Sequence, residues 1–267
     1  MSKSNRPSGA RIEKVLRELA DAADVIAMDF FRRQSELAAE QKGDGSFVTA
    51  ADKAVEAELR RILKSVFPQH SVHGEEEGLI TGVDRTYSWI IDPIDGTHGF
   101  MRGMPIWATL IAFTDRERVI GSMVSAPALA TRWWAGEKTG AHKSFSGGRS
   151  QPISVSAIDS IEESQLLYTG YFASKKQWTG FSNLLDSAWR ERGVGDFWGH
   201  CLVAEGVADG MLDPIVSVWD VAALDLLVRE AGGVMTNSQG SPTYTDGHVI
   251  SSNGIVHQQI LSQLLAD

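Results

Sequence analysis

Two carboxylates and a hydroxyl follow one another closely after a short apolar segment of the chain. The run is Asp92-Pro93-Ile94-Asp95-Gly96-Thr97, directly after Trp89-Ile90-Ile91. Strand ends are where a sheet presents side chains to a crevice, and Pro93 restricts the backbone around it. Two oxygen ligands on one stiff turn suit a hard cation such as Mg²⁺. Gly96 lets backbone N–H groups approach an anion, so the run predicts a metal and a phosphate site together, although an ordinary Asp-Pro turn also explains it.

Three further segments place carboxylates at the start or end of an expected element. Glu75 lies in Gly74-Glu75-Glu76-Glu77-Gly78, after a strand expected to end at His73. Asp52 follows Val48-Thr49, and Asp220 follows Trp219 at the start of an apolar helix. Taken singly, each is explained as well by a solvated acidic loop or by an acid that caps a helix N-terminus.

Taken together, these segments resemble the inositol monophosphatase family of Mg²⁺-dependent, lithium-sensitive phosphatases. The family shows an Asp after a Val-Thr pair, Gly-Glu-Glu, Asp-Pro-Ile-Asp-Gly-Thr, and Trp-Asp-x-Ala-Ala followed by Glu-Ala-Gly-Gly. All four occur here in that order, between Lys42 and Gly233. The resemblance implies a layered α/β fold, an αβαβα sandwich forming a single domain over residues 1–267. It also implies an α+β half (1–150), an α/β half (151–267) and a homodimer.

The resemblance also implies roles for individual residues. Two or three Mg²⁺ ions per active site would be held by Glu75, Asp92, the carbonyl of Ile94, Asp95 and Asp220. Thr97, hydrogen-bonded toward Asp52, would help Glu75 to orient and deprotonate the attacking water. Gly96 and Thr97 would offer backbone N–H groups to the phosphate. In such a site the metals neutralise phosphate oxygens, acidify water and stabilise the leaving alkoxide, so no protein nucleophile is needed.

Two other hydrolase chemistries are disfavoured by the motifs. Haloacid-dehalogenase-type phosphatases use Asp-x-Asp, with the first Asp as nucleophile, whereas two residues separate Asp92 from Asp95. The Gly-x-Ser-x-Gly elbow of serine hydrolases does not occur in the sequence.

Within the family, several segments resemble the bacterial histidinol-phosphate phosphatases. They are residues 105–111, 124–129, 132–135, 192–198 and 218–225. Asp196 follows a glycine turn and suits the ammonium or imidazolium of L-histidinol phosphate. Asp213 aligns with an acidic position that contacts substrate hydroxyls in the family, and Arg192 is a third expected substrate contact. A helix cap, a turn residue and a surface ion pair, respectively, explain these three residues as well.

The expected function is therefore hydrolysis of L-histidinol phosphate to L-histidinol and phosphate, a step of histidine biosynthesis. One alternative is an inositol-1-phosphate or broad sugar-phosphate phosphatase. Another, from a different functional class, is a non-catalytic regulatory or interaction member of the family. The intact acid set argues against the latter, because an interaction module does not need five oxygen donors.

Composition narrows the functional class. The 267 residues are 43% hydrophobic and 22% charged with a net charge of −9, which disfavours a nucleic-acid surface. Cys201 is the only cysteine, so neither an internal disulfide nor a cysteine-based zinc site is possible. No apolar run approaches the length of a membrane span, and residues 1–10 are polar and lack the apolar stretch of a signal peptide. We expect a cytoplasmic enzyme whose partner is a small phosphate monoester, with no nucleic-acid or membrane partner.

Hydrophobic periodicity predicts an α-rich start, a β-rich middle and an alternating second half. The first helix is expected over 11–39, a loop over 42–46, and a second helix from Thr49 or Asp52 to Pro68. Expected strands cover 71–73, 87–91, 107–114, 119–125 and 132–135. The second half is expected to contain a strand over 164–170, helices over 174–190, 199–207, 219–231 and 255–265, and a turn at 237–240.

Overall fold

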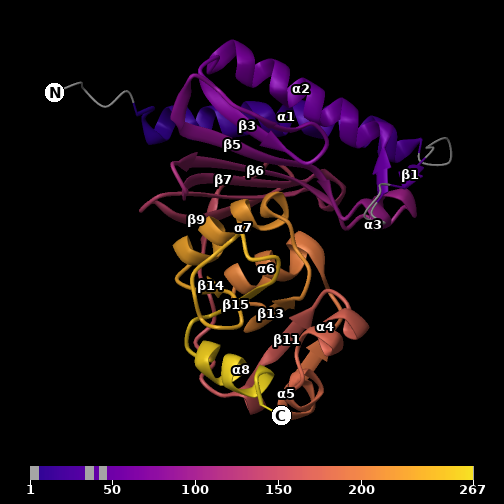
Figure 1. Cartoon of the computed structure of the whole chain (residues 1–267), viewed down its shortest axis with the longest axis vertical. Coiled ribbons are helices and arrows are strands. Elements are labelled where there is room, and N and C mark those ends of the chain that lie inside the picture. Colours follow the sequence, from indigo (N-terminus) through magenta and orange to yellow (C-terminus); the bar gives the residue numbers. More distant parts are fainter. Residues whose placement is uncertain (1–5, 34–38, 42–46, 267) are drawn as a thin grey trace.

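Helices and sheets alternate in five layers, which confirms the expected αβαβα sandwich (Figure 1). The computed structural model describes residues 6–33, 39–41 and 47–266. Two long helices cover the outer face of the first sheet, two further helices lie between the sheets, and the short helices over 181–187 and 257–264 pack on the outer face of the second sheet. Among the described residues, no helix is both long enough and apolar enough to cross a membrane.

The first sheet has eight strands and carries the Asp92 segment near its centre. In spatial order they are β10 (Gln151–Ile153), β9 (Gly140–Phe145), β8 (Thr131–Gly136), β7 (Arg118–Ala126), β6 (Ala108–Asp115), β5 (Asp84–Asp95), β3 (His70–Gly74) and β4 (Gly78–Ile80). Strands β3 and β5 are parallel, and the other neighbours are antiparallel. The acidic loop after β3 and the acidic turn of β5 therefore lie at the same edge of the sheet.

The second sheet has five strands, and its parallel part brings other site residues to one edge. In spatial order they are β12 (Arg190–Arg192), β11 (Gln165–Tyr168), β13 (Gly210–Asp213), β15 (Val249–Ser252) and β14 (Val234–Thr236). Strand β11 is parallel to both β12 and β13, so Asp213 lies at the carboxyl end of a parallel strand. A separate hairpin pairs β1 (Ala39–Gln41) with β2 (Phe47–Thr49).

The helices follow the apolar periodicity of the sequence. They are α1 (Gly9–Arg32), α2 (Ala50–Val66), α3 (Thr97–Met101), α4 (Tyr171–Gln177), α5 (Phe181–Ser187), α6 (Asp196–Ala204), α7 (Val218–Glu230) and α8 (His257–Leu264). Short 3₁₀ turns occupy Pro127–Leu129 and Ile161–Glu163. Helix α7 is buried along nearly its whole length, as expected for a helix that lies between two sheets.

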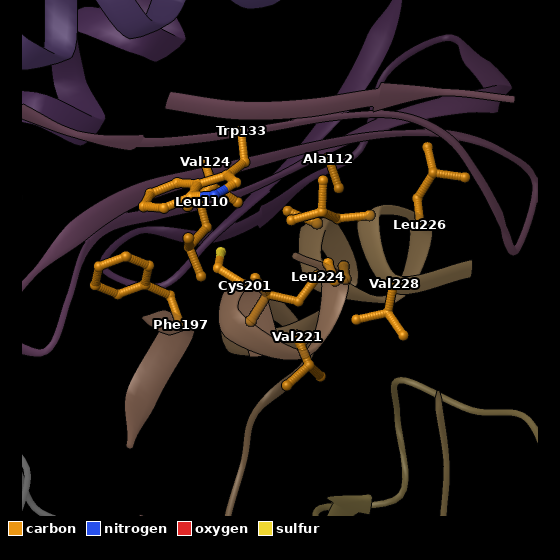
Figure 2. Close-up of a cluster of buried hydrophobic side chains, with 14 of the residues drawn as sticks. Leu110, Ala112, Val124, Trp133, Phe197, Cys201, Val221, Leu224, Leu226 and Val228 are labelled. Atoms are coloured by element: carbon orange, nitrogen blue, oxygen red, sulfur yellow. The ribbon is translucent and has the colours of Figure 1, made fainter. Parts of the chain in front are cut away.

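An apolar cluster fixes the two central helices against the first sheet (Figure 2). Successive residues of a strand face opposite sides of the sheet, so Ile90 joins this cluster while Trp89 and Ile91 pack under α1 and α2. The labelled members are Leu110, Ala112, Val124, Trp133, Phe197, Cys201, Val221, Leu224, Leu226 and Val228. Cys201 is fully buried there among apolar side chains. Because the first turns of α6 and α7 carry Asp196 and Asp220, this core also positions the site.

Two expected helices differ from the observed ones. The first helix ends at Arg32, not at Ala39, which instead begins β1. The apolar stripe of the sequence ends near Phe30 and Phe31, close to the observed end of the helix. The expected helix over 174–190 is split into α4 and α5, because Trp178 is extended and Gly180 lies against the backbone carbonyl of Gln263 with no space for a Cβ. Its last residue belongs to β12.

The expected strands and the other expected helices are present within a few residues of their bounds. Helix α2 begins after Thr49, whose side chain caps it. The loop expected over 42–46 lies outside the described residues. Strand β9 and most of the second sheet, including β13 and β15, were not anticipated from the sequence.

Candidate active site

Three carboxylates from two distant segments converge between the sheets. Oxygen atoms of Asp92, Asp95 and Asp220 lie within 4.8 Å of one another. Asp92 is 2% exposed, and its Oδ1 atom has no hydrogen-bond partner. Buried carboxylate oxygens normally find a donor, and mutually repelling acids gain from a cation between them. The donor set fits a hard divalent ion, because all three ligands supply oxygen.

Local backbone structure places each of these acids. The β5–β6 register shifts between Asp92 and Asp95, so the Pro93–Ile94 irregularity sets both acids at the strand end. Asp95 accepts a hydrogen bond from the backbone N–H of Phe197 at 2.8 Å, which links the strand end to α6. Asp220 is the third residue of α7, where its Oδ2 accepts from the N–H of Ser217 at 2.7 Å in a capping box. The capping interpretation of Asp220 is therefore correct as far as it goes, and it coexists with membership of the cluster.

The acids raise one another's pKa values. Burial, followed by Glu75, Asp95 and Asp220, holds the pKa of Asp92 well above its ordinary value. Burial and the nearby charges of Asp196 and Asp220 do the same to the pKa of Asp95. For Asp220, burial and then Glu75 and Asp213 raise the pKa to about 7, despite the hydrogen bond from Ser217. Desolvation and like charges both disfavour the ionised form, so the site stores repulsion that a bound cation relieves.

A buried ion pair on α2 braces the loop that carries Glu75. The fully buried carboxylate of Glu56 accepts hydrogen bonds from the N–H groups of Glu76 and Glu77 at 2.7 and 3.0 Å. Arg60 donates to Glu56 at 2.8 Å and to the carbonyl of Val72 at 3.3 Å. Glu56 thus holds the backbone of the loop that carries Glu75. The charge of Glu75 contributes to the raised pKa values of Asp92 and Asp220.

Trp219 and His73 connect this loop to the start of α7. Their rings meet edge to face, with centroids 5.5 Å apart. His73 is the penultimate residue of β3, and Trp219 directly precedes Asp220. The contact therefore joins the two segments that bring Glu75 and Asp220 toward Asp92.

The expected hydrogen bond from Thr97 toward Asp52 is not the one in the structure. Thr97 donates its hydroxyl to the carbonyl of Ile94 at 3.0 Å, and a hydroxyl has only one proton to donate. Asp52 caps α2 through the N–H of Thr49, at 2.7 Å, and through its hydroxyl. Burial raises the pKa of Asp52 to about 6, and its Oδ1 atom is buried without a hydrogen-bond partner.

Gly96 requires the conformational freedom of glycine. Its φ of +82° lies in the left-handed region, and a Cβ there would stand 3.0 Å from the carbonyl oxygen of Ile106. The same position is 3.6 Å from Oδ2 of Asp196. The turn after Asp95 and the first residue of α6 therefore lie against each other.

Asp196 and Asp213 form a second acidic group beside the first. Burial, followed by the charge of Asp213, raises the pKa of Asp196 to about 6, and His98 and His200 act in the opposite direction. Asp196 also has a φ of +54°, an uncommon conformation for a residue with a Cβ. Asp213 is 5% exposed, and its Oδ1 atom has no hydrogen-bond partner. Two adjacent, poorly solvated carboxylates suit a cationic ligand.

Arg192 behaves as a surface residue. Its guanidinium donates to the backbone carbonyl of Glu191 at 2.6 Å and lies 3.8 Å from that residue's carboxylate. Its side chain is 53% exposed. This geometry matches the surface ion-pair interpretation of Arg192, and such pairs contribute little.

Three buried or nearly buried polar residues close to the acidic groups were missed from the sequence: Glu56, Arg60 and His200. Glu56 and Arg60 have the i, i+4 spacing of an ordinary surface ion pair, so no local signal marks their contact with a loop about twenty residues away. His200 lies in the apolar segment of α6, where its full burial could not be distinguished from that of its neighbours.

Comparison with known proteins agrees with this geometry. Residues 10–267 match the model of the Inositol monophosphatase family. The chain is 41% identical over 254 residues to the Histidinol-phosphatase of Streptomyces coelicolor, which covers 92% of this chain and 94% of that protein. It is 32% identical to the Nus factor SuhB of Haemophilus influenzae, covering 93% of each. An inositol monophosphatase structure from Zymomonas mobilis superposes with a TM-score of 0.83 at 26% identity, over 97% of this chain and 99% of that one.

The family match spans nearly the whole chain, and the matched region contains both acidic groups and both sheets. The chain therefore belongs to the inositol monophosphatase family, a family of phosphatases.

Proposed function

We propose that the chain is a Mg²⁺-dependent phosphomonoesterase that hydrolyses L-histidinol phosphate by direct attack of water. The observation that carries the proposal is the pairing of two acidic groups: Asp92, Asp95 and Asp220 on one side, and Asp196 with Asp213 on the other. The first group suits divalent cations that bind a phosphate. The second suits a cationic nitrogen on the alcohol that leaves.

The metal ligands would be Glu75, Asp92, the carbonyl of Ile94, Asp95 and Asp220, for two or three ions. The unpartnered Oδ1 of Asp92 and the raised pKa values of the cluster support this fit. When bound, Mg²⁺ supplies charge to neutralise phosphate oxygens, to acidify the attacking water and to stabilise the leaving alkoxide.

The protein's own groups orient the reactants. Glu75 would take the proton of the water, because its loop is held by Glu56 while its carboxylate influences Asp92. We expect the Thr97 hydroxyl to turn from Ile94 toward the unpartnered Oδ1 of Asp52 in the working state, which frees the Ile94 carbonyl. The backbone N–H groups of Gly96 and Thr97 would bind the phosphate.

The choice of substrate rests on electrostatics. L-Histidinol phosphate carries an ammonium and a titratable imidazole, whereas inositol 1-phosphate carries neutral hydroxyls. Leaving Asp196 and Asp213 unpaired in a poorly solvated site is costly, and a charge-assisted hydrogen bond is worth about 1.5–3 kcal/mol. The likeness to histidinol-phosphatases at 41% identity supports the same choice. Arg192 stays a predicted contact that would require its side chain to leave Glu191.

A substrate panel tests the proposal directly. The purified protein with Mg²⁺ is given L-histidinol phosphate, inositol 1-phosphate, fructose 1,6-bisphosphate and p-nitrophenyl phosphate, and phosphate release is measured. We expect the highest kcat/KM for L-histidinol phosphate. A higher kcat/KM for inositol 1-phosphate would overturn the proposed substrate, while the proposed phosphatase activity would stand. Trapping of a hydroxylamine-sensitive aspartyl phosphate on the enzyme in a single turnover would contradict direct attack by water.

A regulatory role is the second candidate, because one relative is named a Nus factor. A variant without phosphatase activity that still fulfils the cellular role would favour it. The family resemblance also predicts a homodimer, which sedimentation would test.

A further inference from the structure

Strands β13 and β15 present two polar side chains to the face covered by α6. Met211 of β13 is paired with Ser251 of β15, so both side chains point to the same side of the sheet. Asp213 lies two residues after Met211 and shares that side. The α6 residue Gly199 packs on the sulfur of Met211, where a Cβ would not fit. The close approach places the next residue, His200, between the helix and the sheet.

His200 spans the gap between Ser251 and Asp213. It is fully buried, and its Nδ1 atom lies 2.8 Å from Oγ of Ser251. Its Nε2 atom has no hydrogen-bond partner and lies 3.8 Å from Oδ2 of Asp213, whose own Oδ1 is also unpartnered. Two buried polar groups therefore face each other without a hydrogen bond, at the edge of the site where Asp196 lies.

We propose that His200 is a positioning residue that sets substrate specificity, by directing an Nε2–H toward Asp213 so that Asp213 and Asp196 together receive a cationic nitrogen of the substrate. The inference rests on the proposed function and assigns the recognition of the leaving alcohol to a chain from Ser251 through His200 to Asp213. A small movement of Asp213 on ligand binding closes the 3.8 Å gap. The unpartnered atoms are then satisfied only in the complex.

The tautomer follows from the surroundings of the ring. Nε2 faces a carboxylate, which favours a proton on that nitrogen, and Nδ1 then accepts from the Ser251 hydroxyl. A hydrogen bond to the other ring nitrogen fixes both the orientation and the proton position of a histidine. Asp213 keeps its remaining oxygen for the substrate.

The test compares His200→Leu, His200→Gln and Ser251→Ala with the wild type, each with Mg²⁺ and two substrates. For L-histidinol phosphate, His200→Leu should lower kcat/KM about tenfold or more, chiefly by raising KM, since one charge-assisted contact is lost. Turnover of p-nitrophenyl phosphate should stay within about twofold, because its leaving group is not cationic. His200→Gln keeps an N–H at a similar position and should recover most of the loss, while Ser251→Ala should change KM in the same direction. Calorimetric binding of L-histidinol, without turnover, should weaken in parallel.

His257 is a matched control for His200, because it contacts the opposite face of strand β15. His257 is 4% exposed and bonds Ser252 and Thr236, each at 2.8 Å. Ser251 and Ser252 are adjacent in β15, so the two histidines lie on opposite faces. His257→Leu should lower the melting temperature and leave the ratio of kcat/KM for the two substrates unchanged.

The outcomes separate this inference from the function on which it rests. A wild type that hydrolyses p-nitrophenyl phosphate but shows no preference for L-histidinol phosphate would overturn the substrate proposal. A wild type with that preference, combined with equal losses on both substrates in folded His200→Leu, would overturn only the role of His200. Retained preference in His200→Leu would do the same.

Discussion

The carboxylate of Glu56 lies directly against the Cα of Gly74, in the space that a Cβ at position 74 would occupy. From there it accepts hydrogen bonds from the backbone N–H groups of Glu76 and Glu77. Glycine at position 74 is therefore what allows a helix on the outer layer to hold the loop of Glu75. The site should therefore be sensitive to a substitution at Gly74, although Gly74 is not a proposed metal ligand.

Gly74→Ala should disturb the site more than its small size suggests. The added methyl must displace a buried, hydrogen-bonded carboxylate, which exposes two backbone donors and breaks the Glu56–Arg60 contact. We expect loss of most phosphatase activity and destabilisation by about 1–3 kcal/mol. Activity and chemical denaturation would measure both. Gly9→Ala, with open space around the new methyl, is the matched control, and equal behaviour of the two variants would contradict the role of Gly74.

Sequence patterns could predict the site where ligands lie on rigid element ends. Asp92 follows a short apolar strand segment, and Asp220 lies in the first turn of an apolar helix. The structure contains both elements where the sequence predicted them. Glu56 and His200 could not be recognised, because their partners are distant in sequence and only the packing of α2 on β3 and of α6 on β13 brings them together. The split between α4 and α5 was hidden for a similar reason. It depends on a close approach between Gly180 and Gln263.

Metal removal should abolish activity reversibly. Treatment with EDTA followed by gel filtration should leave a folded protein without turnover of p-nitrophenyl phosphate, and added Mg²⁺ should restore it. Mg²⁺ should also raise the melting temperature, because a ligand that binds only the native state stabilises it. Full turnover in metal-free buffer would contradict a metal-dependent mechanism.

Asp220→Asn should separate the metal-binding role of the residue from its capping role. The amide oxygen can still accept from the N–H of Ser217, so the helix start is kept. One anionic ligand and one repelling charge are lost. We expect nearly complete loss of turnover, an equal or higher melting temperature without metal, and a smaller stabilisation by Mg²⁺.

Asp225→Asn is the control for Asp220→Asn on the same helix. Asp225 is 5% exposed and pairs with Arg229 at 2.7 Å, away from the acid cluster. This variant should lose stability and keep activity. If Asp220→Asn also kept its activity, the residue would be a helix cap alone.

The metal-free protein should lose stability as pH rises through the range in which its acids ionise. Burial and neighbouring charges raise the pKa of Asp220 from 3.8 to about 7. The native state therefore binds more protons than the unfolded state between these values, and its stability falls as pH increases across that window. His257 has the opposite sign, because burial lowers its pKa from 6.5 to about 4, so its contribution is lost as pH falls.

Comparing the wild type with Asp220→Asn isolates the contribution of Asp220 to the pH dependence of stability, since His257 is present in both proteins. In EDTA, the melting temperature of the variant minus that of the wild type should increase from pH about 5 to pH about 8. Saturating Mg²⁺ should reverse the sign at the higher pH. A difference that does not vary with pH would show that Asp220 does not titrate in this range.

Asp196→Asn should change selectivity without changing the chemistry. Asparagine tolerates the positive φ of this position better than most residues do, so the backbone should be retained while the charge is removed. The loss of one charge-assisted contact, about 1.5–3 kcal/mol, corresponds to a fall in kcat/KM for L-histidinol phosphate of about ten- to a hundredfold. Turnover of p-nitrophenyl phosphate should be spared. Asp209→Asn is the control. Asp209 is a 5% exposed acid at the opposite end of β13, and it accepts a hydrogen bond from the N–H of Gln165 at 2.7 Å. Its replacement should not change the ratio of kcat/KM for the two substrates. Equal losses on both substrates in Asp196→Asn would place Asp196 in the scaffold, because a residue that recognises the leaving group can only affect the substrate that carries the cation.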